Sequence, residues 1–153
     1  MFNISEKECF LITDLQDQEK LCIEKYEKSA TAAVDPVLQD LFSSIKQDEQ
    51  RHYDSLGQVL KGKVPAVNSD DTAGKNYKPK ASYTASTNNA DKENDKFLCT
   101  DAITTEKYTA GAYNFDMFQF GNSDVRRLLN DIETEEQNHA EKIYKYKMAN
   151  GMC

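Results

Sequence analysis

Two histidines, and the glutamates three residues before them, are the side chains of this sequence best suited to chemistry. His52 follows Glu49 and His139 follows Glu136, and these are the only two histidines in 153 residues. A spacing of three places both side chains of each pair on one face of a helix. Carboxylate oxygens together with imidazole nitrogens are ligands that suit iron and manganese. The two pairs therefore predict a metal site.

Both pairs lie within apolar stripes of the sequence. In residues 36–60 the apolar positions follow a helical spacing of three and four, and Glu49 and His52 fall in that series. Glu136 and His139 fall in the same kind of series in residues 123–149. Because an ionised carboxylate on a core-facing stripe is costly unless it is paired or coordinated, these positions favour ligands over surface residues.

Two further acids interrupt the stripes of the remaining helical segments. Glu19 does so in the first segment and Asp101 in the third. One acid from each of two helices, with a Glu-x-x-His pair from each of two others, is the ligand set of dinuclear carboxylate centres in helical bundles. The sequence therefore predicts two iron or manganese ions held by Glu19, Glu49, His52, Asp101, Glu136 and His139. The structural alternative is a buried polar network inherited from a metal-binding ancestor.

Tyr26 and Tyr108 stand seven residues after Glu19 and Asp101. We expect these tyrosines to fill core volume with their hydroxyls satisfied. Hydrogen bonding to ligands and electron donation are the functional alternatives. Cys22 is expected to be a small buried side chain.

Four helices account for most of the sequence, at roughly 5–33, 36–60, 91–119 and 123–149. Ser5 and Glu8 form a capping box, Asp35-Pro36 is a helix start, and Gly151 is a helix stop. Residues 61–90 are rich in glycine, proline and small polar residues and read as one long connection. A crossover between parallel helices needs such a length. The fold expected is a single all-α domain, two helical hairpins joined by a long crossover.

The two expected hairpins resemble each other. Residues 45–52 match residues 132–139, and further upstream Glu24-Lys25-Tyr26 matches Glu106-Lys107-Tyr108. This internal repeat predicts a bundle with pseudo-two-fold symmetry.

Charge and composition exclude several classes of partner. The net charge is −7 with no basic cluster, which argues against nucleic acid and anionic membranes. No apolar run reaches the ~18 residues of a membrane span. The charged residues within positions 1–10 are unlike a signal peptide, so we expect synthesis in the cytoplasm without one.

No two of the four cysteines form a C-x-x-C motif. Reduced thiols are expected. Intermolecular cross-linking through Cys9, Cys99 or the terminal Cys153 is the alternative.

Two family resemblances rest on these residues. The pattern of Glu19, Tyr26 and Glu49-x-x-His52 resembles the first half of rubrerythrin-type ferritin-like proteins. Residues 98–114, followed by 135–139, are similar to the coat F family of bacterial spore coat proteins. These resemblances imply a ferritin-like four-helix bundle deposited in the spore coat, with itself or other coat proteins as partners. They also imply that Glu49 and Glu136 bridge the ions while Glu19 and Asp101 are terminal ligands.

The sequence departs from the family patterns at three points. Asp101 is one methylene shorter than the usual glutamate, Leu98 stands where rubrerythrins carry an additional acid, and a rubredoxin-like cysteine set is missing. The function expected is a coat F-type spore coat protein with a dinuclear site that oxidises with dioxygen or decomposes peroxide. A purely structural coat component with a vestigial site is the alternative. Iron storage is a third option that would require a cage.

Overall fold

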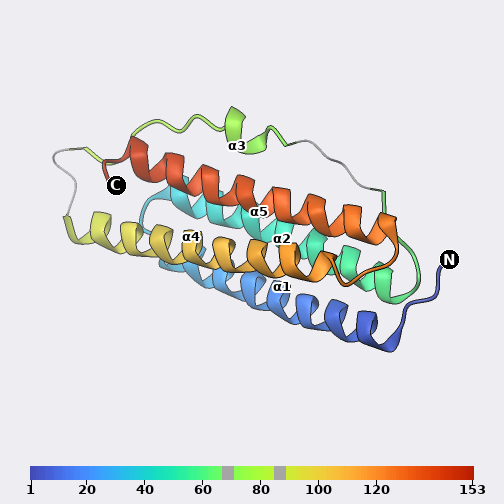
Figure 1. Cartoon of the computed structure of the whole chain (residues 1–153). Coiled ribbons are helices and arrows are strands. Elements are labelled where there is room, and N and C mark those ends of the chain that lie inside the picture. The colour runs from blue at the N-terminus through green and yellow to red at the C-terminus, as the bar shows by residue number, and fades with distance from the viewer. Residues whose placement is uncertain (67–70, 85–88) are drawn as a thin grey trace.

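The computed structural model describes residues 1–66, 71–84 and 89–153, and this part of the chain is helical with no strand. Four long helices lie side by side (Figure 1): α1 (Glu6–Ala32), α2 (Pro36–Leu60), α4 (Asn89–Met117) and α5 (Ser123–Ala149). A single-turn helix, α3 (Ala73–Asn76), lies between α2 and α4. The all-α prediction is confirmed, and the long helices start and end within two residues of the expected ranges. None of the described helices is long and apolar enough to cross a membrane.

The long helices pack as two hairpins, α1 with α2 and α4 with α5 (Figure 1). The hairpins meet through contacts of α1 with α4 and of α2 with α5. The crossover leaves α2 at one end of the bundle and enters α4 at the other. Each contacting pair is therefore antiparallel, and residues from the middles of all four helices can share one central layer.

Local sequence sets where the helices begin. Ser5 accepts a hydrogen bond from the Glu8 amide, and the Glu8 carboxylate accepts one from the Ser5 amide. Asp35 caps α2, whose first residue is proline, and the Asn122 side chain accepts from two amides at the start of α5. These caps satisfy helix-end amides that packing alone would leave unpaired.

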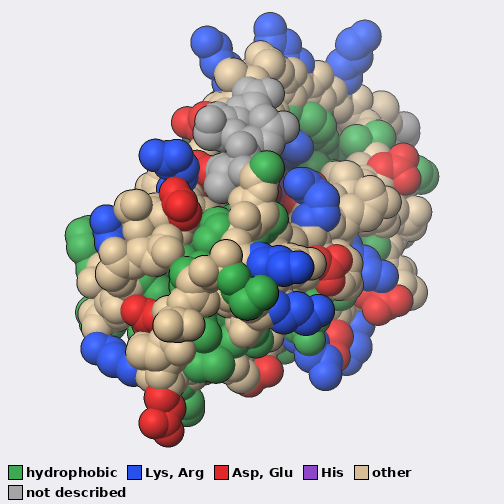
Figure 2. Space-filling model, turned by 90° about the vertical axis from the view of Figure 1, so that its right-hand side faces the viewer, with side chains coloured by type: hydrophobic (Ala, Val, Ile, Leu, Met, Phe, Trp, Pro, Cys, Tyr) green, Lys and Arg blue, Asp and Glu red, His purple; other side chains and the backbone are tan. Residues whose placement is uncertain are grey.

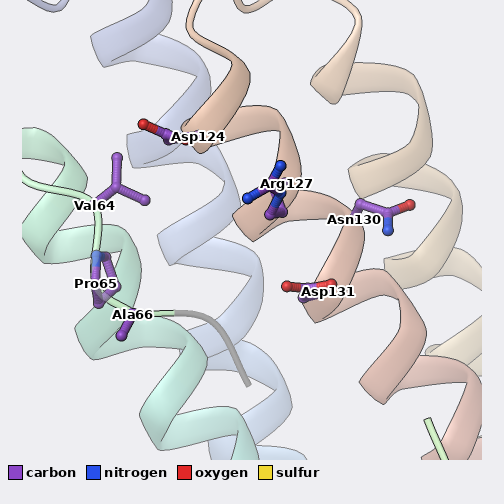
Figure 3. A pocket seen from close by; sticks show the side chains of 7 residues that line it. All are labelled: Val64, Pro65, Ala66, Asp124, Arg127, Asn130 and Asp131. Carbon is purple, nitrogen blue, oxygen red and sulfur yellow. The ribbon is translucent and has the colours of Figure 1, made fainter. Parts of the chain in front are cut away.

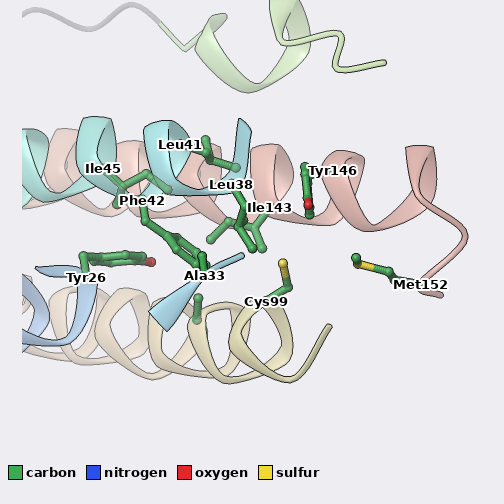
Figure 4. Close-up of a cluster of buried hydrophobic side chains, with 11 residues drawn as sticks. Tyr26, Ala33, Leu38, Leu41, Phe42, Ile45, Cys99, Ile143, Tyr146 and Met152 are labelled. Carbon is green, nitrogen blue, oxygen red and sulfur yellow. The ribbon is translucent and has the colours of Figure 1, made fainter. Parts of the chain in front are cut away.

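Two apolar clusters fill the ends of the bundle interior. One is centred on Tyr26, Phe42 and Tyr146 (Figure 4). The other contains Tyr113 and Leu129 and lies toward the opposite end. The middle of the interior, between these clusters, is occupied by charged and polar side chains.

The described part of the crossover packs along α5. The Gly74 amide donates to Oδ1 of Asn138 at 2.8 Å, and Nζ of Lys145 donates to the Gly74 carbonyl at 2.6 Å. A Cβ on Gly74 would lie 2.4 Å from a carboxylate oxygen of Glu141, so glycine permits this close approach. The sequence predicted neither α3 nor this packing, and residues 67–70 and 85–88 of the expected connection lie outside the described residues.

At the far end of the crossover, two buried aspartates join three segments. Asp95 of α4 accepts hydrogen bonds from the amides of Val34 and Asp35, both at 2.9 Å, and from the Tyr83 hydroxyl. Asp35 in turn accepts from the Tyr146 hydroxyl at 2.6 Å. This network fixes the α1–α2 turn against the start of α4 and the end of α5, which sets the register of the two hairpins.

Candidate metal centre

Each long helix buries one glutamate in the middle of the bundle. Glu19, Glu49 and Glu136 have no exposed surface, and Glu106 is 1% exposed. All four occupy positions in the buried stripe of their helix. Helix packing therefore brings four carboxyl groups together in one layer.

The two histidines lie in the same layer. His52 and His139 are buried, and their ring centroids are 6.1 Å apart. Figure 2 shows the end of the bundle near the N-terminus, where no histidine surface is visible. The imidazoles are therefore part of the interior rather than of the charged surface.

The six side chains form two overlapping groups of possible metal ligands. Within each group, one ligand atom from every residue lies within 4.8 Å of the others. The groups are Glu19, Glu49, His52 and Glu136, and Glu49, Glu106, Glu136 and His139. Because two carboxylates belong to both groups, the arrangement has the form of two neighbouring sites with two shared ligands.

The inward-facing atoms of these groups lack hydrogen-bond partners among the described residues. Both oxygens of Glu49 and of Glu136 are unpaired, as is Oε2 of Glu19 and of Glu106. Nδ1 is unpaired in both histidines. Nδ1 of His52 lies 2.8 Å from Oε1 of Glu136, yet that contact lacks hydrogen-bond geometry.

Buried polar atoms are normally satisfied, and leaving one unpaired costs about 1–3 kcal/mol. Here the unpaired atoms are oxygens and imidazole nitrogens that converge on a common centre. Four carboxylates and two imidazoles match the charge and ligand preference of two divalent cations. The residues present therefore fit a pair of metal ions.

Each histidine is held from outside the cluster by an acid of the opposite hairpin. Nε2 of His139 lies 2.9 Å from Oδ2 of Asp48, and Nε2 of His52 contacts Oε2 of Glu135. Arg51 pairs with Asp48 and lies 4.0 Å from Glu135. A carboxylate on Nε2 fixes the ring and leaves Nδ1 directed inward as a ligand.

Two buried tyrosines hold the outer oxygens of two carboxylates. The Tyr26 hydroxyl donates to Oε1 of Glu106 at 2.5 Å, and the Tyr113 hydroxyl donates to Oε1 of Glu19 at 2.5 Å. Each bond joins α1 to α4. Burial and the adjacent carboxylates hold the pKa of both tyrosines well above its usual value, so both hydroxyls stay protonated donors.

The metal-free cluster takes up protons. Burial and the neighbouring Glu49 raise the pKa of Glu19 to about 8. Burial and the surrounding carboxylates hold the pKa of Glu136 well above its usual value. Burial opposes a charge on His52, but Glu135 and Glu19 outweigh it and raise the pKa to about 10. In the metal-free protein, bound protons thus offset the negative charge of the carboxylates. Bound cations would offset the same charge.

The structure brings together Glu19, Glu49, His52, Glu136 and His139 but leaves Asp101 outside. Asp101 is partly exposed and forms a 3.2 Å ion pair with Lys25. Glu106 occupies the fourth carboxylate position in its place. Tyr108, expected beside the site, is 79% exposed, and the buried tyrosine of α4 is Tyr113.

The register of α4 explains these differences. Its buried stripe is Asp95, Cys99, Ala102, Glu106, Thr109 and Tyr113, largely polar or small. Its bulky apolar residues face outward, with Phe97 and Phe115 both 70% exposed. Reading aromatic residues as core-facing therefore shifted the predicted face of this helix.

One signal in the sequence identifies the residues that were missed. The same offset of 87 positions relates Glu49 to Glu136 and His52 to His139. Applied to the rest of the first hairpin, it pairs the residues Glu19 with Glu106, Tyr26 with Tyr113 and Asp48 with Glu135. The match of Glu24-Lys25-Tyr26 with Glu106-Lys107-Tyr108 is a local similarity out of this register.

Two small surface pockets reach the histidines between α2 and α5. One, of about 100 Å³, is lined by His52 and the other, of about 220 Å³, by His139. Arg51 and Glu135 line both pockets and separate them. Both pockets bring solvent to the edge of the cluster at a histidine.

A larger pocket, of about 630 Å³, lies elsewhere, between the segment after α2 and the first turns of α5 (Figure 3). Its lining is Val64, Pro65, Ala66, Asp124, Arg127, Asn130 and Asp131. It contains no histidine or cysteine and is separate from the candidate metal centre.

Comparison with known proteins relates the second hairpin to one family. Residues 94–153 match the family model of the Coat F domain. No curated protein and no solved structure matches the chain significantly. The matched segment covers nearly all of α4 and the whole of α5, and so half of the candidate ligand set. The match supports the predicted relation to spore coat proteins of the Coat F type.

Proposed function

We propose that this chain is a Coat F-type spore coat protein with a ferritin-like bundle that binds two iron or manganese ions. The observation that carries the proposal is the set of buried, unpaired ligand atoms that converge from six side chains. A structural network would pair these atoms with one another or with hydrogen-bonding partners. The imidazole Nδ1 atoms instead lie 2.8 Å and 3.0 Å from oxygens of Glu136 and Glu49 without hydrogen-bond geometry, which supports cation ligands over a hydrogen-bonded network.

The shared residues define the roles. Glu49 and Glu136 belong to both groups and would bridge the two ions. Glu19 and His52 would complete one shell, and Glu106 and His139 the other. Bound iron or manganese would supply redox chemistry with dioxygen or peroxide.

The surrounding residues of this chain perform the other tasks. Tyr26 and Tyr113 orient the terminal carboxylates by holding their outer oxygens. With ions bound, Asp48 and Glu135 would keep the one remaining proton of each imidazole on Nε2, away from the centre. The apolar clusters above and below exclude water along the bundle axis, so that a small oxidant would enter past Arg51.

The second candidate is a purely structural coat component that retains the ligands without metal. The Coat F match favours it, because that match is to a domain of coat proteins. Deposition in the spore coat, and association with other coat components there, belong to both candidates.

Metal analysis separates the two candidates. We would purify the chain without added metal, load it anaerobically with Fe(II) or Mn(II), and count ions per chain. The Glu49→Gln/Glu136→Gln double variant removes both bridging carboxylates with little change of volume. Asp101→Asn is the matched control, because Asp101 is an acid of the same bundle outside the cluster.

About two ions per chain are expected in the wild type and in Asp101→Asn, and none in the double variant. If the wild type binds no more metal than the double variant after loading, the metal-binding proposal fails and the structural candidate is supported.

A further inference from the structure

The outer face of α4 carries an aromatic stripe that nothing in the described chain covers. Three rings on it are largely exposed, Phe97 (70%), Tyr108 (79%) and Phe115 (70%), and a fourth, Phe118 (76%), follows in the turn directly after the helix. The α3 part of the crossover lies along α5, on the side of the bundle away from α1 (Figure 1). The stripe is therefore open to solvent in the single chain.

The stripe has the spacing of a helix-pairing seam. Positions 97, 101, 104, 108, 111, 115 and 118 alternate steps of four and three residues, a heptad pattern. On an isolated helical hairpin such a pattern marks the core-facing side. On α4 the core is built from a different stripe, which contains Glu106 and Tyr113. The helix therefore has two seams, and only one of them is covered.

Gly111 lies in the middle of this stripe, and no contact within the described chain requires a glycine there. A Cβ at this position would meet no atom within 4 Å. A glycine in a helix interior costs about 1 kcal/mol relative to alanine. A residue without a side chain does, however, permit a second helix to approach closely.

The stripe is complementary to itself in the antiparallel direction. With a two-fold axis between Lys107 and Tyr108, Phe97 falls opposite the second copy's Phe118. Thr104 then falls opposite the second copy's Gly111, and the Lys107 side chain lies beside the second copy's Tyr108, where a cation–π contact is favourable. Aromatic residues meet at both ends, Lys107 and Tyr108 meet at the axis, and a small residue faces a glycine on either side of it.

The area is sufficient for a dimer. Four aromatic side chains at these exposures offer roughly 500 Å² per chain, and two chains roughly 1,000 Å² in total. A specific interface needs about 1,000 Å² or more. The net charge of −7 argues against an anionic lipid surface as the occupant.

We propose that the outer face of α4 binds the same face of a second copy of this chain, antiparallel and about a two-fold axis near Tyr108. Metal is not needed for this contact, because the stripe and the ligands lie on different faces of α4.

Sedimentation equilibrium of the full chain, with reductant present to exclude cross-links through exposed Cys153, tests the proposal. A dimer with a dissociation constant of about 1–10 µM is expected for the wild type. Phe97→Lys/Phe118→Lys should weaken it at least about 30-fold, because two buried aromatic contacts are lost. Tyr144→Lys/Met148→Lys is the matched control, since both residues are exposed on α5.

Gly111→Ala gives a sharper second readout. The added Cβ meets open space in the single chain, so the thermal stability of the monomer should stay the same or rise. The dimer should weaken, because the added Cβ lies in the seam opposite Thr104 of the second copy. The proposal is overturned if the wild type is monomeric at about 100 µM, well above the expected dissociation constant. It is also overturned if the α5 control weakens the dimer as much as the α4 variant does, because the two copies would then meet through a different face.

Discussion

The two halves of the candidate metal centre are alike at the ligands and unlike at the surface. The half around His52 and the half around His139 each have a terminal glutamate, a shared pair of carboxylates and a tyrosine on the outer oxygen. Outside the ligands, His52 is held by a glutamate and His139 by an aspartate. The pocket at His139 has about twice the volume of the one at His52, about 220 against 100 Å³.

The internal repeat of the two hairpins therefore preserves the side chains at the centre but not the shape of the surface around them. Residues that converge on the centre obey one offset along the sequence, because both hairpins must supply the same ligands. The positions that line the two pockets also correspond, Arg51 with Asn138 and Ser55 with Lys142, but their residue types differ, and the connection after α2 contributes Ala66 to one pocket and Ala73 to the other. We therefore expect equal ligand strength in the two halves and unequal access from solvent.

The largest effect should come from removing the terminal carboxylate of one half. Glu106→Gln should cost the chain one of two ions, because the His139 half then keeps only the shared carboxylates and its imidazole. Asp101→Asn should bind both ions. Elemental analysis after loading measures the difference. If both variants lost the same number of ions, Asp101 would have to be a ligand, and the face that α4 turns toward the cluster would differ from the one described.

The stability of the metal-free protein should fall as pH rises from about 5 to about 8. The pKa of Glu19 is raised by burial and by Glu49 to about 8, above its usual 4.5. Because the folded state binds the Glu19 proton more tightly than the unfolded state does, this proton stabilises the fold at pH values below the usual pKa of 4.5. The contribution is lost as pH rises through about 8.

Thermal unfolding in the presence of a chelator measures the fall. Glu19→Gln should make it shallower, because the amide cannot lose a proton. A metal-free protein equally stable across this range would show that Glu19 is charged in the folded state.

The acids behind the histidines should have smaller and nearly equal effects. Asp48→Asn and Glu135→Gln each replace a carboxylate on Nε2 by an amide, which weakens the control of ring orientation. Each should lower metal affinity about 10–100-fold. Competition with a calibrated chelator gives both values. A large loss in only one variant would show that the two halves differ at the metal as well as at the surface.

The smallest effect should come from the tyrosines. Tyr26→Phe and Tyr113→Phe each leave a buried carboxylate oxygen without its donor, at a cost of about 1–3 kcal/mol in unfolding free energy. Denaturant unfolding of the metal-free protein measures this cost. If neither substitution changes stability, the short hydroxyl–carboxylate contacts contribute nothing to the fold.

The sequence was sufficient for most of the helices and for five of the six side chains that the structure brings together in the candidate centre. The apolar stripes in α2 and α5 are regular, and the Glu-x-x-His pairs fall within them, so the buried faces of these helices are clear from the sequence. In α4 the aromatic residues occupy an outward seam, whereas the buried face holds Asp95, Glu106 and Thr109. Hydrophobicity alone selects the wrong face there, and only the constant offset between hairpins restores Glu106.

The single-turn helix α3 and the path of the crossover were also beyond prediction. They depend on tertiary contacts such as Gly74 with Asn138, which leave no periodic pattern in the sequence.

Anomalous diffraction from crystals of the metal-loaded protein tests the dinuclear centre most directly. Data collected on either side of the iron or manganese absorption edge would place each ion relative to its ligands. We predict two peaks, both in contact with Glu49 and Glu136, one next to His52 and Glu19 and the other next to His139 and Glu106. Peaks only at surface acids, or none within the bundle after loading, would contradict the dinuclear centre and leave the cluster as a buried polar network.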